Sequence, residues 1–161
     1  MFDISELCRY SSSVRRRFLE KLESLSWDEV TKNREASFYS MRNILIHMID
    51  NEDWIVNWVI HGKSREYKRK KAEEYTSIQM IKNHLEDVEG RTKAYLAGAG
   101  EDELRRRVDL VLLSSGASFD LSVEEALFQS FTEQLYHMGE LIALLWQEDI
   151  EPPKMQYFYN R

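Results

Sequence analysis

The stretch that decides the fold is SVEEALFQSFTEQLYHMGELIALLWQ, residues Ser122–Gln147. Ser122 and Glu125 have the spacing of a capping box, in which two side chains bind the free N–H groups at a helix start. No proline follows before Gln147, so the sequence predicts an uninterrupted helix about 39 Å long. Its apolar residues recur at steps of three and four, which indicates that one face packs against other helices.

Three earlier segments show the same helical spacing of apolar residues. Ser37 is the expected N-cap of the second segment, and Gly62 is expected to end it as the first residue beyond the helix. Thr76 and Gln79 have capping-box spacing at the start of the third. The predicted helices cover about Asp3–Leu22, Ser37–His61 and Thr76–Gly98.

The segment between Leu104 and Leu121 has a different period. Val108, Leu110 and Leu112 alternate with other residues, and a Ser-Ser-Gly turn follows. We therefore expect a small extended arm or β-hairpin between the third and fourth long helices. Four long amphipathic helices with one long crossover predict an all-α protein, a four-helix bundle, and a length of 161 residues fits a single domain over residues 1–161.

Composition limits the classes of function. The formal net charge is −6, which disfavours binding to nucleic acid, and no apolar run approaches the roughly 20 residues of a membrane span. The N-terminus lacks the basic start and apolar block of a secretory signal. The single cysteine, Cys8, can form neither an internal disulfide nor a Cys-rich zinc site. These observations predict a cytoplasmic protein without membrane or nucleic-acid partners.

One pair in the last helix has the spacing of metal ligands. Glu133 and His137 lie one helical turn apart, so both side chains can reach one ion. A carboxylate on a partly inward face is costly unless it is paired, hydrogen-bonded or metal-bound. His47, among the apolar residues of the second helix, is the natural third ligand. A His, His and carboxylate set suits zinc with an open position, and also nickel, iron or manganese.

The spacing alone leaves a second reading open, because Glu-x3-His pairs are also common as hydrogen-bonded core pairs or surface contacts. Asn51, one turn after His47, and Tyr136, beside His137, could orient a ligand or a water molecule, or could be ordinary polar contacts. Trp54 and Trp58 are expected to fill the core or a dimer interface.

Two stretches, Ser40–Met48 (SMRNILIHM) and Tyr136–Glu140 (YHMGE), resemble the DinB/YfiT-like superfamily of metalloenzymes, and the resemblance spans nearly the whole chain. In that family a His on the second helix joins two residues one turn apart on the last helix, usually His-x3-His before a Gly-Gln pair. Here Glu133 takes the first of those two positions and Glu140 replaces the usual Gln. The similar mycothiol-dependent maleylpyruvate isomerases use His, Glu and His, so the resemblance implies that ligand capacity is kept.

The resemblance also implies a function. Similar proteins with a known activity are thiol-dependent transferases or isomerases, which predicts one divalent metal ion, zinc or nickel, a low-molecular-weight thiol as cosubstrate, and a small-molecule substrate. The alternatives are a metal-dependent hydrolase, or a non-catalytic stress-response or interaction protein whose metal is structural or absent. The chain contains four tryptophans and seven phenylalanines, which is more aromatic surface than one small core needs. This excess, together with the dimers that similar proteins form, predicts a homodimer.

Overall fold

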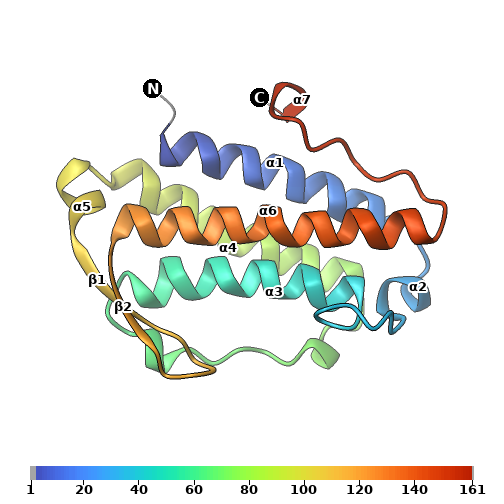
Figure 1. Ribbon diagram of the computed structural model, residues 1–161, viewed down its shortest axis with the longest axis horizontal. Coiled ribbons are helices and arrows are strands. Elements are labelled where there is room, and N and C mark those ends of the chain that lie inside the picture. The colour runs from blue at the N-terminus through green and yellow to red at the C-terminus, as the bar shows by residue number, and fades with distance from the viewer. Residues whose placement is uncertain (1–2, 161) are drawn as a thin grey trace.

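Four long helices lie side by side in the computed structural model, which describes residues 3–160 (Figure 1). Helix α1 packs against α4 and α6, and α3 packs against the same two helices, so each long helix has two long neighbours. The predicted all-α bundle is therefore confirmed. The long helices are α1 (Ile4–Glu23), α3 (Met41–Trp54), α4 (Ile78–Gly98) and α6 (Val123–Gln147).

No helix in residues 3–160 is long and apolar enough to cross a membrane. Short elements complete the described chain. The short elements are α2 (Trp27–Thr31), the π-helix η1 (Ile55–Val59), the 3-10 helices η2 (Ser64–Glu66) and η3 (Ala72–Glu74), α5 (Glu101–Arg105), the strands β1 (Arg107–Val111) and β2 (Ser118–Ser122), and α7 (Tyr157–Asn160).

The helix starts follow side-chain capping, with two corrections to the predicted positions. The capping box of Ser122 and Glu125 is present at the start of α6. Helix α3 is capped by Ser40 and not by Ser37, because the Ser40 hydroxyl accepts from the Asn43 N–H. Helix α4 begins one residue late, since Ser77 caps it in place of Thr76. Where several hydroxyl residues stand close together, the sequence does not say which one caps.

Helix α3 continues into η1, where each backbone hydrogen bond spans one residue more than in an α-helix. The Ile60 N–H donates to the Ile55 carbonyl across 3.1 Å, and the Lys63 N–H donates to the Trp58 carbonyl across 2.8 Å. Both bonds span five residues, which defines a π-turn. Gly62 follows with φ +71°, the left-handed conformation that favours glycine, as predicted for the residue beyond the helix. The helical segment itself ends at Val59, two residues before the predicted His61.

The expected extended arm is an antiparallel hairpin that packs against one end of the bundle. Strand β1 pairs with β2 so that Val108 lies opposite Leu121 and Leu110 opposite Phe119. These residues share one face, while Arg107 and Asp109 lie on the other, which is the alternation that the sequence shows. Buried Val108 and Leu110 join the apolar core near Trp54 and Phe131.

Two apolar clusters form the core, and Cys8, as well as Trp54, is buried in one of them. A buried polar group also joins the four long helices. Arg15 of α1 donates to Glu52 of α3, Glu89 of α4 and Gln134 of α6. Helices α3 and α6 are therefore connected through buried hydrogen bonds as well as apolar contacts.

Candidate metal centre

The fold brings His47, Glu133 and His137 together, as the sequence predicts. Their candidate ligand atoms all lie within 4.8 Å of one another. His47 Nε2 is 3.1 Å from Glu133 Oε1, and His137 Nε2 is 3.8 Å from the same oxygen. His47 is on α3 and the other two are on α6, so the site lies across the contact between these helices. The three side chains form a candidate metal-binding group.

Glu140 fixes the orientation of His137. Its Oε2 atom lies 2.5 Å from Nδ1 of His137, one turn along α6, which leaves Nε2 directed toward Glu133. Burial lowers the pKa of His137, but the hydrogen bonds to Glu133 and Glu140 outweigh it and hold this pKa above its usual value. A carboxylate on the remote nitrogen of a histidine is the arrangement that sets the tautomer of a metal ligand.

Asn51 holds the second oxygen of Glu133. Its Nδ2 atom donates to Glu133 Oε2 across 3.1 Å, so the carboxylate is oriented from both sides. Hydrogen bonds from His137 and His47 keep the pKa of Glu133 far below its usual range, which makes this side chain an anion at neutral pH. Asn51 is expected from the sequence to orient a ligand, and the structure shows the contact through which it can orient Glu133.

The donor set fits a divalent ion. A tetrahedral zinc with bonds of about 2.0–2.2 Å places its ligand atoms about 3.4 Å apart, and the distances from the two histidine Nε2 atoms to Glu133 Oε1, 3.1 and 3.8 Å, lie on either side of that value. His47 directs Nε2 at Glu133, while its other ring nitrogen, Nδ1, is buried and has no hydrogen-bond partner among the described side chains, so His47 lacks the outer contact that Glu140 gives His137. Two imidazoles and one carboxylate are ligands that zinc, nickel and iron accept.

Aromatic rings surround the histidines. Phe38 stacks on His47 with ring centroids 4.1 Å apart and touches His137 edge-on at 5.3 Å. Tyr136 also contacts the His137 ring, at 5.1 Å, but its side chain is 69% exposed. Phe38 and Glu140 have no role in the sequence-based site. Glu140 could have been found because it lies three residues after His137 on the same helix, whereas nothing in the sequence marks Phe38.

A cavity of about 890 Å³ opens onto the candidate metal-binding group. It lies between α3, α6 and the β1–β2 hairpin, and its polar end includes His47, Asn51 and Glu133. Ligand pockets in proteins span roughly 300–1,000 Å³, so this cavity is large enough for a drug-sized molecule. The site is thus open to this cavity, and Phe38 also lines it.

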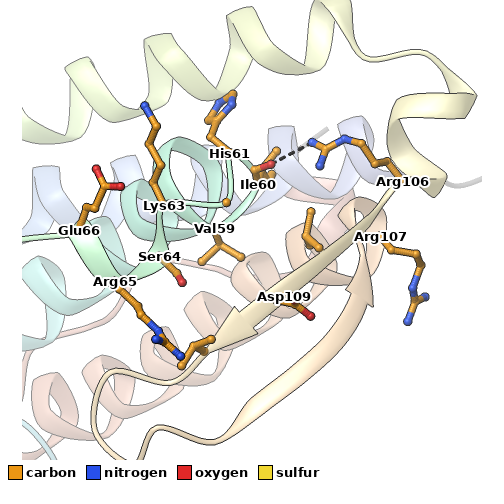
Figure 2. A pocket seen from close by; sticks show the side chains of 13 residues that line it. Val59, Ile60, His61, Lys63, Ser64, Arg65, Glu66, Arg106, Arg107 and Asp109 are labelled. Atoms are coloured by element: carbon orange, nitrogen blue, oxygen red, sulfur yellow. Dashed lines mark hydrogen bonds between the residues drawn. The ribbon is translucent and has the colours of Figure 1, made fainter.

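A second cavity, of about 800 Å³, lies between residues 59–66 and β1 (Figure 2). Its cations do not converge: Lys63 and Arg65 point in opposite directions (Figure 2). Arg106 donates to the Ile60 carbonyl and pairs with Glu103, and Arg107 pairs with Asp120. This cavity therefore lacks the convergent polar groups of the candidate metal centre.

Comparison with known proteins agrees with the fold and gives the family. A model of the DinB family matches residues 1–161, and the chain belongs to this family. A DinB-like protein from Bacillus subtilis, YjoA, has 18% sequence identity and a TM-score of 0.70, over 93% of this chain and 97% of that one. A DinB-like protein from Bacillus cereus ATCC 10987 has 14% identity and a TM-score of 0.67, over 90% of each chain. A comparison with curated protein sequences finds no match.

Proposed function

We propose that this DinB-family protein is a metal-dependent enzyme, a thiol-dependent transferase or isomerase, that holds one divalent ion, zinc or nickel, with His47, Glu133 and His137. The observation that carries the proposal is that these three side chains converge and that two of them, His47 and Glu133, line a cavity of about 890 Å³. Three protein ligands beside an accessible cavity leave a coordination position for a substrate. A purely structural site is closed by its protein ligands.

Each residue of the site has a separate task in this proposal. Glu133 supplies the negative charge that a divalent cation needs, and Asn51 holds the oxygen that is not turned toward the histidines. Glu140 keeps Nε2 of His137 directed at the common point. Phe38 covers the face of His47 and excludes water there. These contacts preorganise the ligands, which reduces the cost of ordering them when an ion binds.

The chemistry follows from the open position. A bound divalent ion lowers the pKa of a thiol that reaches it, so that the thiolate forms near neutral pH. With the ion held by His47, Glu133 and His137, such a thiolate would form a C–S bond to an electrophilic carbon of the second substrate, and the leaving group of that carbon would depart with its bonding electrons. The thiol proton would pass to solvent. The fixed walls hold both reactants in one orientation, which contributes to the rate.

The test combines metal analysis with an activity assay. Purified protein supplied with zinc or nickel is expected to hold about one ion per chain, and His137→Ala is expected to hold none. The loaded protein is then mixed with 1-chloro-2,4-dinitrobenzene and, in turn, cysteine, glutathione and coenzyme A. Metal-dependent release of chloride with formation of the thioether supports the proposal. Equal metal content in wild type and His137→Ala refutes it.

Metal-dependent cleavage of activated esters without any thiol would instead assign the site to a hydrolase, in which water takes the open position. A protein that binds metal and catalyses neither reaction would favour the non-catalytic interaction protein. The thiol series, run beside a p-nitrophenyl ester, separates these three outcomes in one set of assays.

We also propose a homodimer, formed through an exposed stripe on α6. Phe128, Tyr136 and Trp146 are large apolar side chains exposed on this helix. Gly139 stands between them with open space over its Cα, so a second helix can approach closely. Light scattering at micromolar concentration should give twice the chain mass of 19.2 kDa, and Trp146→Lys should give the monomer mass. A monomeric wild type would refute the dimer.

The further expectations are a cytoplasmic location and no binding to nucleic acid. They are supported by the single cysteine and the formal net charge of −6. A salt-resistant complex with duplex DNA in a mobility-shift assay would contradict the second expectation.

A further inference from the structure

The apolar face of the hairpin is packed more closely along β1 than along β2. Val108 and Leu110 of β1 are buried, whereas Phe119 of β2 is 48% exposed although it lies on the same face, opposite Leu110. Leu113, just beyond β1, is 50% exposed. Strand β2 and the turn thus present apolar side chains that no described residue fully covers. Large apolar side chains left in this state favour contact with another apolar surface.

These half-exposed side chains border the cavity above the candidate metal centre. Its apolar wall comes from two elements, because Trp54 and Ile55 at the end of α3 stand across from the hairpin residues. A molecule in the cavity would therefore contact apolar atoms on two sides. The hairpin residues that line the cavity are Leu110, Leu112, Leu113, Phe119 and Leu121, together with Ser114.

The remaining wall is polar, and its two carboxylates already have partners. Glu125, Gln129 and Glu133 line the cavity at successive turns of α6. The Glu125 carboxylate accepts from Arg107 and from the Ser122 N–H, and Glu133 is the carboxylate assigned to the divalent ion under the proposed function. The polar wall therefore does not select for a positively charged organic molecule.

Arg69 is the single lysine or arginine among the described residues that line this cavity. Its Nε atom lies 3.2 Å from Asp50 Oδ2, and the side chain is 47% exposed. The two terminal nitrogens of Arg69 donate no hydrogen bond to any residue within 3–160. The two N–H groups on each of these nitrogens therefore remain for a ligand. A guanidinium with a free edge suits a carboxylate, sulfonate or phosphate.

We propose that the cavity binds a small organic acid, with an aromatic or branched apolar body against the hairpin and a single anionic group on Arg69. The inference rests on the proposed function and deepens it, because it names the class of the second substrate at the same site. The hairpin thus acts as the wall that selects the substrate, and Phe119 and Arg69 are its specificity-determining residues. The volume of the cavity, its apolar wall and Arg69, its single lysine or arginine side chain among the described residues, all match such a ligand.

The test uses two dyes with the same apolar character and different charge. 8-Anilinonaphthalene-1-sulfonate carries an aromatic body and one anion, and N-phenyl-1-naphthylamine carries the body alone. Both are titrated by fluorescence against the native dimer or monomer as purified. Arg69→Gln is expected to raise the Kd of the sulfonate about tenfold and to leave the neutral dye within twofold. Phe119→Ser is expected to raise both Kd values at least fivefold.

Matched variants control for general surface effects. Arg65→Gln removes an arginine that lines the other cavity, and Phe158→Ser removes a phenylalanine, 63% exposed, on α7. Both should bind the two dyes like wild type. Leu113→Ser provides a second change in the apolar wall, and circular dichroism melts verify that each variant is folded. Equal dye affinity in Phe119→Ser and Phe158→Ser, or no effect of Arg69→Gln, overturns the proposal.

The readout also separates this inference from the metal assignment. His137→Ala without metal should keep sulfonate binding within threefold, since the dye sits on the hairpin and Arg69. Dye binding without metal binding leaves the organic-acid pocket standing and refutes the proposed function. Metal binding without specific dye binding leaves the proposed function standing and refutes the organic-acid pocket. If Phe119→Ser changes the molar mass in solution and not the dye affinity, the hairpin face is covered by a second copy and the pocket assignment is wrong.

Discussion

Nη1 of Arg15 lies 2.7 Å from Oε2 of Glu52, and both side chains are fully buried. Burial raises the pKa of Glu52, but Arg15, Thr92 and Gln134 outweigh it and lower that pKa, so the ion pair persists at neutral pH. Glu52 follows Asn51 directly, and Gln134 follows Glu133. Glu52 and its hydrogen-bond partner Gln134 therefore adjoin the candidate metal centre in sequence, on α3 and α6.

The first prediction concerns this pair. Arg15→Met leaves Glu52 as a buried carboxylate without its cation, and it should lower the free energy of unfolding by about 3–5 kcal/mol. Arg105→Met removes an exposed arginine that pairs with Glu101, and it should change stability little. Urea unfolding followed by circular dichroism compares the two. Similar losses in both variants would show that the buried pair has no special weight.

The second prediction separates a ligand from a general base at Glu133. Glu133→Gln keeps the shape and removes the anion, so metal affinity should fall at least tenfold. Glu133→His should restore binding, because it recreates the three-histidine pattern of similar proteins. Metal content after dialysis, together with competition against a chelator, provides the measurement. Full metal content in the Gln variant with loss of activity alone would make Glu133 a base.

The third prediction concerns Glu140, which accepts from His137. Glu140→Ala should weaken metal binding about 10–100-fold, as removal of a carboxylate behind a histidine ligand typically does. Glu140→Gln keeps an oxygen acceptor in place and should recover most of this loss. The same competition assay applies. An alanine variant as tight as the glutamine variant would mean that the contact does not orient the histidine.

The fourth prediction is a pH dependence of stability. Burial raises the pKa of Asp50 from 3.8 to about 7, against the opposing effect of Arg69. Between these values the folded state keeps a proton that the unfolded state has lost, so stability decreases as pH rises to about 7 and stays low above it. Asp50→Asn removes this cost, and its gain in stability should be about 2–3 kcal/mol larger at pH 8 than at pH 5.

Chemical denaturation at the two pH values measures the gain. The matched control is Asp102→Asn, an exposed aspartate on α5, whose effect should be the same at both pH values. A gain from Asp50→Asn that is equal at pH 5 and pH 8 would show that Asp50 ionises in the folded protein as it does in the unfolded chain.

The sequence predicts those features that depend on local spacing. Helical periodicity locates the four long helices, and alternation with a Ser-Ser-Gly turn locates the hairpin. The Glu133 and His137 pair follows from a one-turn offset, and His47 from its place among apolar residues on a facing helix. The resemblance to a family then selects a metal site over an ordinary core pair.

The remaining features depend on contacts that sequence spacing does not encode. Phe38 reaches His47 from a loop in which Glu35 and Tyr39 adopt positive φ values, and no pattern predicts those dihedrals for residues other than glycine. The cavity wall joins the hairpin to the end of α3, and its depth is set by how far the two elements stand apart. Such distances follow from tertiary packing.

The π-turn at Ile55–Val59 has a consequence for how this helix tolerates a change of length. A π-turn holds one residue more than a regular α-helical turn, so deletion of one residue there would restore regular winding and leave the direction of the following chain nearly unchanged. Everything before the π-turn, including His47 and Asn51, would keep its direction toward α6. A change of length at this point would therefore leave both the candidate metal centre and the start of the connector to η2 in place.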